Sequence, residues 1–126
     1  ERISVLTGLE YWRNLSQKQL KFIAGQADSH PSAYCFALIA MQNALSNGGL
    51  LVCAVQNGYD AAKIRAYADK KAPGTAVIVK TPENGTLLEK IAPFTADYPV
   101  PDGGERYYLC KNGACLAPTD SLDKLP

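Results

Sequence analysis

The four cysteines are the residues of this chain with the most versatile chemistry, because a thiolate can attack a disulfide, bind a metal or form a cross-link. They are Cys35, Cys53, Cys110 and Cys115 in a chain of 126 residues. Cys35 and Cys53 each lie in an apolar stretch, and free cysteine is among the most buried residue types. We therefore expect both to be inert fillers of the core.

Cys110 and Cys115 differ, because four residues separate them and Asn112-Gly113 lies in the middle. Asn-Gly is a strong signal for a tight hairpin turn, so the two sulfurs could come close. Three interpretations stay open: structural thiols, which we favour, a local disulfide across a very short loop, and redox or metal chemistry. Cys110 and Cys115 are the candidate site residues, as structural or redox thiols.

The sequence gives little support for a hydrolase triad, a zinc site or a pair of catalytic carboxylates. His30 is the only histidine, whereas hydrolase triads need a histidine base and zinc sites usually show paired ligand spacings. Nothing in the spacing of the acidic residues forces a carboxylate pair of the glycosidase kind. The acidic candidates are Glu10, Glu83, Glu89 and Asp97. We predict no catalytic residues, no metal and no cofactor for this chain.

Composition and charge exclude several classes of protein. The chain has 13 Lys+Arg against 12 Asp+Glu, and the net charge of +1 predicts no nucleic-acid partner. Hydrophobic residues make up 47% of the chain, which is typical of a packed globular domain. No apolar run reaches the roughly 18 residues of a membrane helix, and no basic-then-apolar leader is visible. We expect no membrane association and a cytoplasmic location.

The elements that must position the cysteines change type near residues 47–49. Before this point the apolar spacing predicts helices over 9–24 and 33–45, joined by a short loop into an antiparallel hairpin. The second helix is apolar on most of its circumference, which predicts burial between partners. It is the obvious element to cover one face of the sheet that follows.

After residue 49 strands alternate with helices. Strands are predicted over 50–55, 75–80, 106–110 and 114–117, and helices over 59–71 and 87–91. Such alternation is typical of a parallel layer with right-handed crossovers. The predicted class is α/β: an N-terminal helical hairpin, 1–47, packed on a small, three- to four-stranded, mostly parallel sheet with flanking helices, 48–126.

The turn after the first predicted strand is where a nucleotide-binding α/β domain would hold the phosphates. A dinucleotide site needs several glycines there, so that the backbone can approach the phosphates. The turn over 55–60 holds only Gly58, and Asp60 suits the first turn of a helix. A plain turn is therefore favoured, and a small nucleotide-binding α/β domain stays an alternative.

The tail of the chain carries a specific pattern. Residues 107–120 read YYLCKNGACLAPTD, and Leu122 and Leu125 follow. This pattern is an aromatic strand, two cysteines with four residues between them, a proline and a leucine-bearing helix. It resembles the C-terminal end of a large family of thioredoxin-domain-containing proteins, named after a spermatogenesis-associated human member. Three further segments resemble the same family: 30–34, 74–79 and 87–94.

The resemblance implies a thioredoxin-like domain, then an (α/α)6 toroid of the six-hairpin glycosidase type, then this α/β region. It implies that 1–47 is the last helical hairpin of the toroid and that 48–126 is the terminal domain. A start at Glu1 in place of Met also predicts a piece of a longer protein. The family's acidic, histidine and thioredoxin cysteine residues would lie upstream of Glu1, so none is assigned here.

We therefore expect a non-catalytic C-terminal fragment that caps or buttresses the toroid of a larger protein, whose activity could concern carbohydrate. Its expected partners are the upstream toroid and thioredoxin-like domains of the parent chain. Removed from them, the helix over 33–45 predicts self-association through an exposed apolar face. The first alternative, of a different class, is a redox module that uses Cys110 and Cys115.

Overall fold

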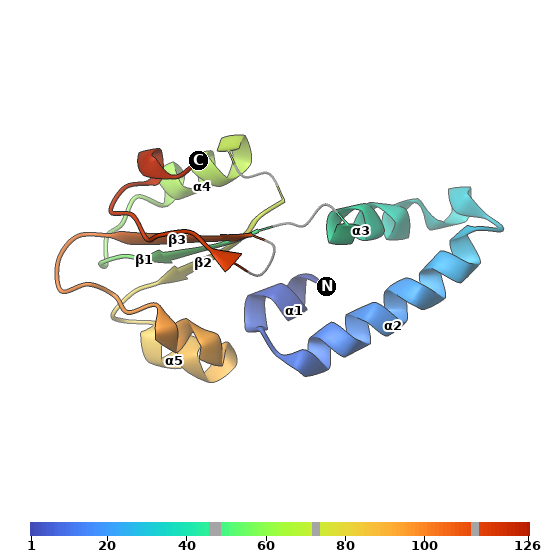
Figure 1. The fold of residues 1–126 in the computed structure, drawn as a ribbon, viewed down its shortest axis with the longest axis horizontal. Coiled ribbons are helices and arrows are strands. Elements are labelled where there is room, and N and C mark those ends of the chain that lie inside the picture. Colours follow the sequence, from blue (N-terminus) through green and yellow to red (C-terminus); the bar gives the residue numbers. More distant parts are fainter. Residues whose placement is uncertain (46–48, 72–73, 112–113) are drawn as a thin grey trace.

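A computed structural model describes residues 1–45, 49–71, 74–111 and 114–126 (Figure 1). The helices are α1 (Arg2–Thr7), α2 (Glu10–Ala27), α3 (Cys35–Leu45), α4 (Ala61–Lys71) and α5 (Gly85–Ile91). The strands are β1 (Leu50–Ala54), β2 (Ala76–Lys80), β3 (Arg106–Lys111) and β4 (Ala114–Cys115). Short 3-10 segments are η1 (Pro31–Tyr34), η2 (Pro93–Asp97) and η3 (Leu122–Lys124). This order of elements confirms the α/β class with N-terminal helices.

The sheet is mixed, with strand order β2-β1-β3-β4. β1 and β2 are parallel and joined through α4, but β3 runs antiparallel to β1, and β4 antiparallel to β3. The expected parallel crossover into the third strand is therefore wrong. α5 has only 7 residues, and the segment 98–105 brings the chain back to the end of the sheet at which β2 finishes, on the other side of β1 (Figure 1). β3 consequently enters the sheet in the opposite direction.

The core lies on both faces of β1, as its continuous apolar run predicts. Leu51 and Cys53 are fully buried on the face that packs against Ile64 of α4 and Leu122 of η3. Side chains alternate along a strand, so Val52, also fully buried, belongs to the opposite face. Figure 1 shows α4 on one side of the sheet and α5 on the other.

The N-terminal helices contact the α/β unit through α1, an element that the sequence did not predict. α1 packs beside β2 (Figure 1), and the connection from α1 to α2 lies against the Phe94 ring. Gly8 in that connection has φ 67°, and a Cβ there would lie 2.8 Å from the Phe94 ring. Glycine is therefore required both for the left-handed backbone and for the close approach.

α2 and α3 form the expected hairpin, but α3 does not cover the sheet. No residue of α3 is buried, and α1 takes the place beside β2 and leads the hairpin away from it (Figure 1). The expectation that the helix over 33–45 packs on the sheet is wrong. A helix that is apolar on every side has no polar face to indicate which neighbour it meets.

Several predicted features lie outside the described residues. They are the helix end at Asn47-Gly48, the break at Pro73, the turn at Asn112-Gly113 and the boundary between the two parts at 47–48.

Candidate redox site and exposed helical faces

β3 and β4 place Cys110 and Cys115 directly opposite each other. In the next pair of the register, Leu116 N–H donates to Leu109 O at 2.9 Å. Since hydrogen-bonded and non-bonded pairs alternate, the cysteines occupy the non-bonded type, in which side chains approach most closely. The two sulfurs form a disulfide. Of the three interpretations, the local disulfide is the pairing that the structure contains, in place of the structural thiols that we favoured.

The hydroxyl of Tyr98, just after η2, lies against the disulfide. Its oxygen is 3.4 Å from Cys115 Sγ and 3.7 Å from Cys110 Sγ. Because a disulfide carries no hydrogen, the phenol is the donor and the sulfurs are weak acceptors. Sequence reasoning missed Tyr98, since no spacing links a loop tyrosine to a hairpin that begins eight residues later.

Aromatic rings hold Tyr98 in place. Its ring packs edge-to-face with Tyr108, at a centroid distance of 4.7 Å, and with Phe94, at 6.1 Å. Burial raises the pKa of the Tyr98 phenol, and the nearby Asp97 and Tyr108 raise it further. The hydroxyl is thus protonated at neutral pH and able to donate.

Access to the disulfide is one-sided. Cys115 lies on the short edge strand β4 and is exposed, whereas Cys110 on β3 is half-buried. The exposed Lys111 follows Cys110 in the chain. An external thiol therefore reaches Cys115 more readily than Cys110.

The other two cysteines have contrasting environments. Cys53 is fully buried, which confirms its expected place in the core, and burial, with Glu105 second, raises its thiol pKa to about 12. Cys35 was expected to be buried as well, and this is wrong: it is exposed, and its Sγ donates to Ser32 O at 3.1 Å. It starts α3, none of whose residues is buried.

We expect iodoacetamide at pH 8 to alkylate Cys35 in the folded chain and to leave Cys53 unmodified. The Cys53 pKa of about 12 lies well above this pH, so almost no reactive thiolate forms, and burial blocks the reagent. Peptide mass spectrometry of the labelled chain should show labelling of Cys53 slower by more than about 100-fold. Equal rates in the native state would contradict the burial of Cys53, and urea should equalise them.

A buried cation ties together the elements that carry Tyr98. Lys80, at the end of β2, is 4% exposed, and its Nζ donates to Glu89 Oε1 of α5 and to Thr95 O of η2, both at 2.7 Å. Of the four acidic residues considered for a carboxylate pair, Glu89 thus serves a structural ion pair. The cation fixes η2 against the sheet and so positions Tyr98.

Lys80→Ala is expected to lower the free energy of unfolding by about 2 kcal/mol, because it removes a buried, charge-assisted hydrogen bond to the carbonyl of the fully buried Thr95. That carbonyl would keep only the Tyr98 backbone N–H, at 3.2 Å. The ion-pair contribution is small, since Glu89 is 44% exposed. The matched control is Lys124→Ala, which removes an exposed pair with Asp120. Urea unfolding should show no measurable change for the control, and equal losses in the two variants would contradict the structural role of Lys80.

The turn from β1 to α4 does not favour a phosphate. Gly58 has φ 84°, as a tight turn requires. Asp60 Oδ1 accepts the Lys63 backbone N–H at 3.0 Å, so a carboxylate already occupies the start of α4. A phosphate at this helix end would meet that negative charge. The nucleotide-binding alternative therefore gains no support from this turn.

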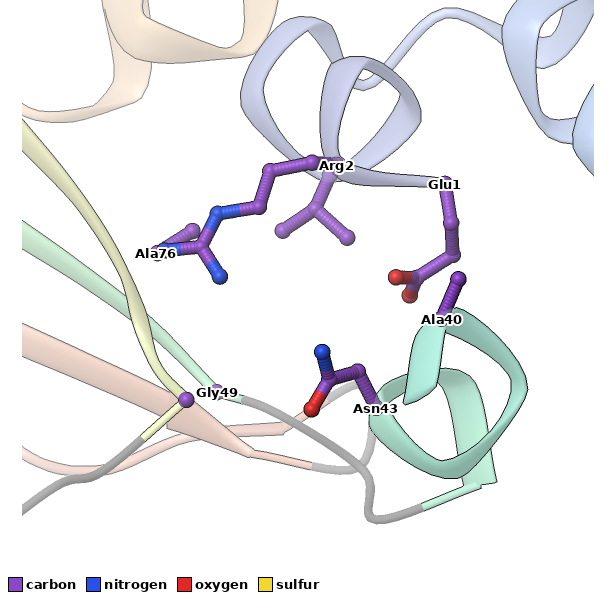
Figure 2. Close-up of a pocket in the computed structure, with 8 residues that line it drawn as sticks. Glu1, Arg2, Ala40, Asn43, Gly49 and Ala76 are labelled. Carbon is purple, nitrogen blue, oxygen red and sulfur yellow. The ribbon is translucent and has the colours of Figure 1, made fainter. Parts of the chain in front are cut away.

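A hollow of about 230 Å³ lies where the helices meet the sheet, and Figure 2 shows the residues that line it. Its labelled lining residues are Glu1, Arg2, Ala40, Asn43, Gly49 and Ala76. The lining comes from α1, α3 and the strand ends, and it combines one acidic and one basic side chain with small residues. The hollow marks the space between α3 and the sheet, and its side chains do not form a nucleophile–base pair.

Two exposed apolar faces remain on the helical hairpin. On α2, Tyr11, Leu15 and Phe22 share one stripe at helical spacing, and they are 68%, 38% and 65% exposed. On α3, Phe36 and Ile39 are 91% and 53% exposed. α2 and α3 contact each other, and this contact leaves both groups of side chains exposed.

The part of the chain that the structure describes offers neither a metal site nor a membrane-spanning helix. There, no cluster of three or more His, Cys, Asp or Glu side chains could hold a metal ion. Within the same residues, none of the helices combines the length and apolar character needed to cross a bilayer.

Comparisons with protein-family models, with curated proteins and with solved structures returned no match. The function is therefore inferred from the geometry and from the sequence resemblance alone.

Proposed function

We propose that this chain is the non-catalytic C-terminal part of a larger thioredoxin-domain protein, in which α2 and α3 pack against further helices of a toroid. The observation that carries the proposal is the exposure of the apolar helix α3. Its 11 residues, CFALIAMQNAL, include no charged side chain, yet none of them is buried. A helix that is apolar all round is normally enclosed on several sides by other elements.

The second exposed stripe supports the same arrangement. Tyr11, Leu15 and Phe22 of α2 are exposed as well, so both helices of the hairpin offer apolar surface. A hairpin inside a ring of hairpins has neighbours on more than one side, which is the environment that these faces fit. The α/β unit, with its own core around β1, would close the end of the toroid.

In this proposal the chain acts by packing and not by turnover. Any carbohydrate chemistry would reside in the upstream toroid. A cytoplasmic location is part of the proposal, and it makes the disulfide notable, since lasting structural disulfides are rare in that compartment.

Hydrogen exchange can test the docking of the hairpin. We expect the amides of α3 to exchange much faster in the isolated chain than in the full-length gene product, because docked helices open less often. The helix α4, which buries Ile64 and Tyr67 within the chain, is the internal control and should exchange alike in both. Equal exchange of α3 in the two proteins would contradict the proposal.

The intact mass of the native gene product provides an independent check. A mass several times 13.6 kDa is expected. A native product near 13.6 kDa would overturn the proposed parent protein.

A further inference from the structure

We propose that Cys110 and Cys115 form a reversible thiol–disulfide exchange site, with Tyr98 as the hydrogen-bond donor that stabilises the thiolates. This function goes beyond the packing role of the chain and does not depend on it. It would exchange electrons with external thiols, of either the monothiol or the dithiol kind.

The fold does not need this disulfide to hold the hairpin together. Backbone hydrogen bonds join the same two segments on the sheet side of the cysteines: Leu116 N–H to Leu109 O at 2.9 Å, and a mutual pair between Tyr107 and Thr119 at 2.8 and 3.0 Å. The cysteines are only 5 positions apart, and such a short loop restricts the unfolded chain little. Reduction should therefore leave the fold intact.

The site also offers an open route of attack. Cys115 is exposed on β4, the edge strand, so an external thiolate can reach its Sγ while Cys110 stays half-buried. The aromatic side chains of Phe94, Tyr98 and Tyr108 pack together on the side from which the Tyr98 hydroxyl meets the sulfurs. Buried disulfides lack such access.

The exchange balances with two external thiols. A thiolate attacks Cys115 Sγ, the S–S bond breaks, and Cys110 leaves as a thiolate that takes a proton from solvent. A second external thiolate then attacks the external sulfur of the mixed disulfide and releases Cys115 as a thiolate. The protein disulfide is reduced to a dithiol, and two external thiols are oxidised to one disulfide.

Tyr98 assists both steps. Its hydroxyl is 3.7 Å from Cys110 Sγ, the first leaving group, and 3.4 Å from Cys115 Sγ, the second. Sulfur accepts weakly in a disulfide but strongly as a thiolate, so this hydrogen bond strengthens as the bond breaks. The other ionisable groups near the pair are Asp97 and Tyr108, which influence the Tyr98 pKa, and Lys111 beside Cys110.

The experiment uses the Cys35→Ser variant, which removes the other exposed thiol. The chain is equilibrated with glutathione and glutathione disulfide in varied ratios, and in parallel with reduced and oxidised dithiothreitol. Rapid alkylation and intact mass spectrometry then count the free thiols. We expect one reversible two-electron transition with unchanged circular dichroism. Persistent oxidation in both native buffers, or unfolding on reduction, would overturn the proposal.

The two arms identify the external thiol. Reduction by glutathione indicates a monothiol partner, and reduction by dithiothreitol alone indicates a dithiol partner.

Tyr98→Phe tests the proposed donor. We expect about tenfold slower reduction and an alkaline shift in the pH profile of Cys115 alkylation after reduction, because the thiolate loses its hydrogen bond. Tyr11→Phe, on the exposed face of α2, is the control and should change neither. If Tyr98 had a purely structural role, Tyr98→Phe would not shift the pH profile of Cys115 alkylation. An unshifted profile would therefore contradict the proposed role of Tyr98 as a hydrogen-bond donor.

Discussion

Leu109→Ala is expected to lower the free energy of unfolding by about 3–4 kcal/mol, because it opens a cavity in the most buried part of the fold. Leu109 is fully buried and lies on β3, between β1 and β4, where it packs in the cluster that contains Leu51 and Leu122. The surrounding sheet is hydrogen-bonded on both sides of β3, so it cannot collapse into the space. Urea unfolding followed by circular dichroism measures the loss.

Leu116→Ala is the matched control, since Leu116 hydrogen-bonds Leu109 across the hairpin but is 46% exposed. It should change the free energy of unfolding by less than about 0.5 kcal/mol. Similar losses in both variants would contradict the burial of Leu109 and the exposure of Leu116. The comparison also bears on the redox site, because Leu109 adjoins Cys110 and fixes the register that sets it opposite Cys115.

The sequence predicted the individual elements of the α/β unit better than their directions. The apolar run of β1 was enough to predict a strand covered on both faces, because burial on both sides leaves no polar alternation. The direction of β3 was not predictable in this way. It depends on how the segment 98–105 folds back after α5 (Figure 1). The sequence of this loop has no periodic pattern of apolar residues, so it does not predict the path of the backbone.

The candidate site was predictable only in part. The Asn-Gly spacing indicated that Cys110 and Cys115 could meet, and the register of β3 and β4 brings them together. Neither Tyr98 nor the support that Lys80 gives to η2 could be predicted, because both contacts join residues that are distant along the chain. Cys35 was misjudged for a related reason: its apolar neighbours along the sequence indicate burial, but the described fold leaves it exposed.

The exposed face of α3 leads to the second large expected effect. We expect the isolated chain to self-associate as its concentration rises, and Phe36→Lys combined with Ile39→Glu to abolish this. Phe36 and Ile39 are 91% and 53% exposed, and burying two such side chains favours association by a factor of about 100 or more. The double variant keeps the net charge and adds an i,i+3 ion pair that suits a solvated helix.

Sedimentation velocity over a concentration series measures the association. The control is Asn14→Glu combined with Gln17→Lys on α2, which introduces the same charges at exposed polar positions and should leave self-association unchanged. In the full-length gene product, the α3 variant should raise hydrogen exchange in α3, because the same side chains would then face the toroid. A wild-type chain that stays a monodisperse monomer at high concentration would contradict the use of this face in association. If the α3 variant also left the hydrogen exchange of α3 unchanged in the full-length protein, the face with Phe36 and Ile39 would dock neither to a second copy of the chain nor to the toroid.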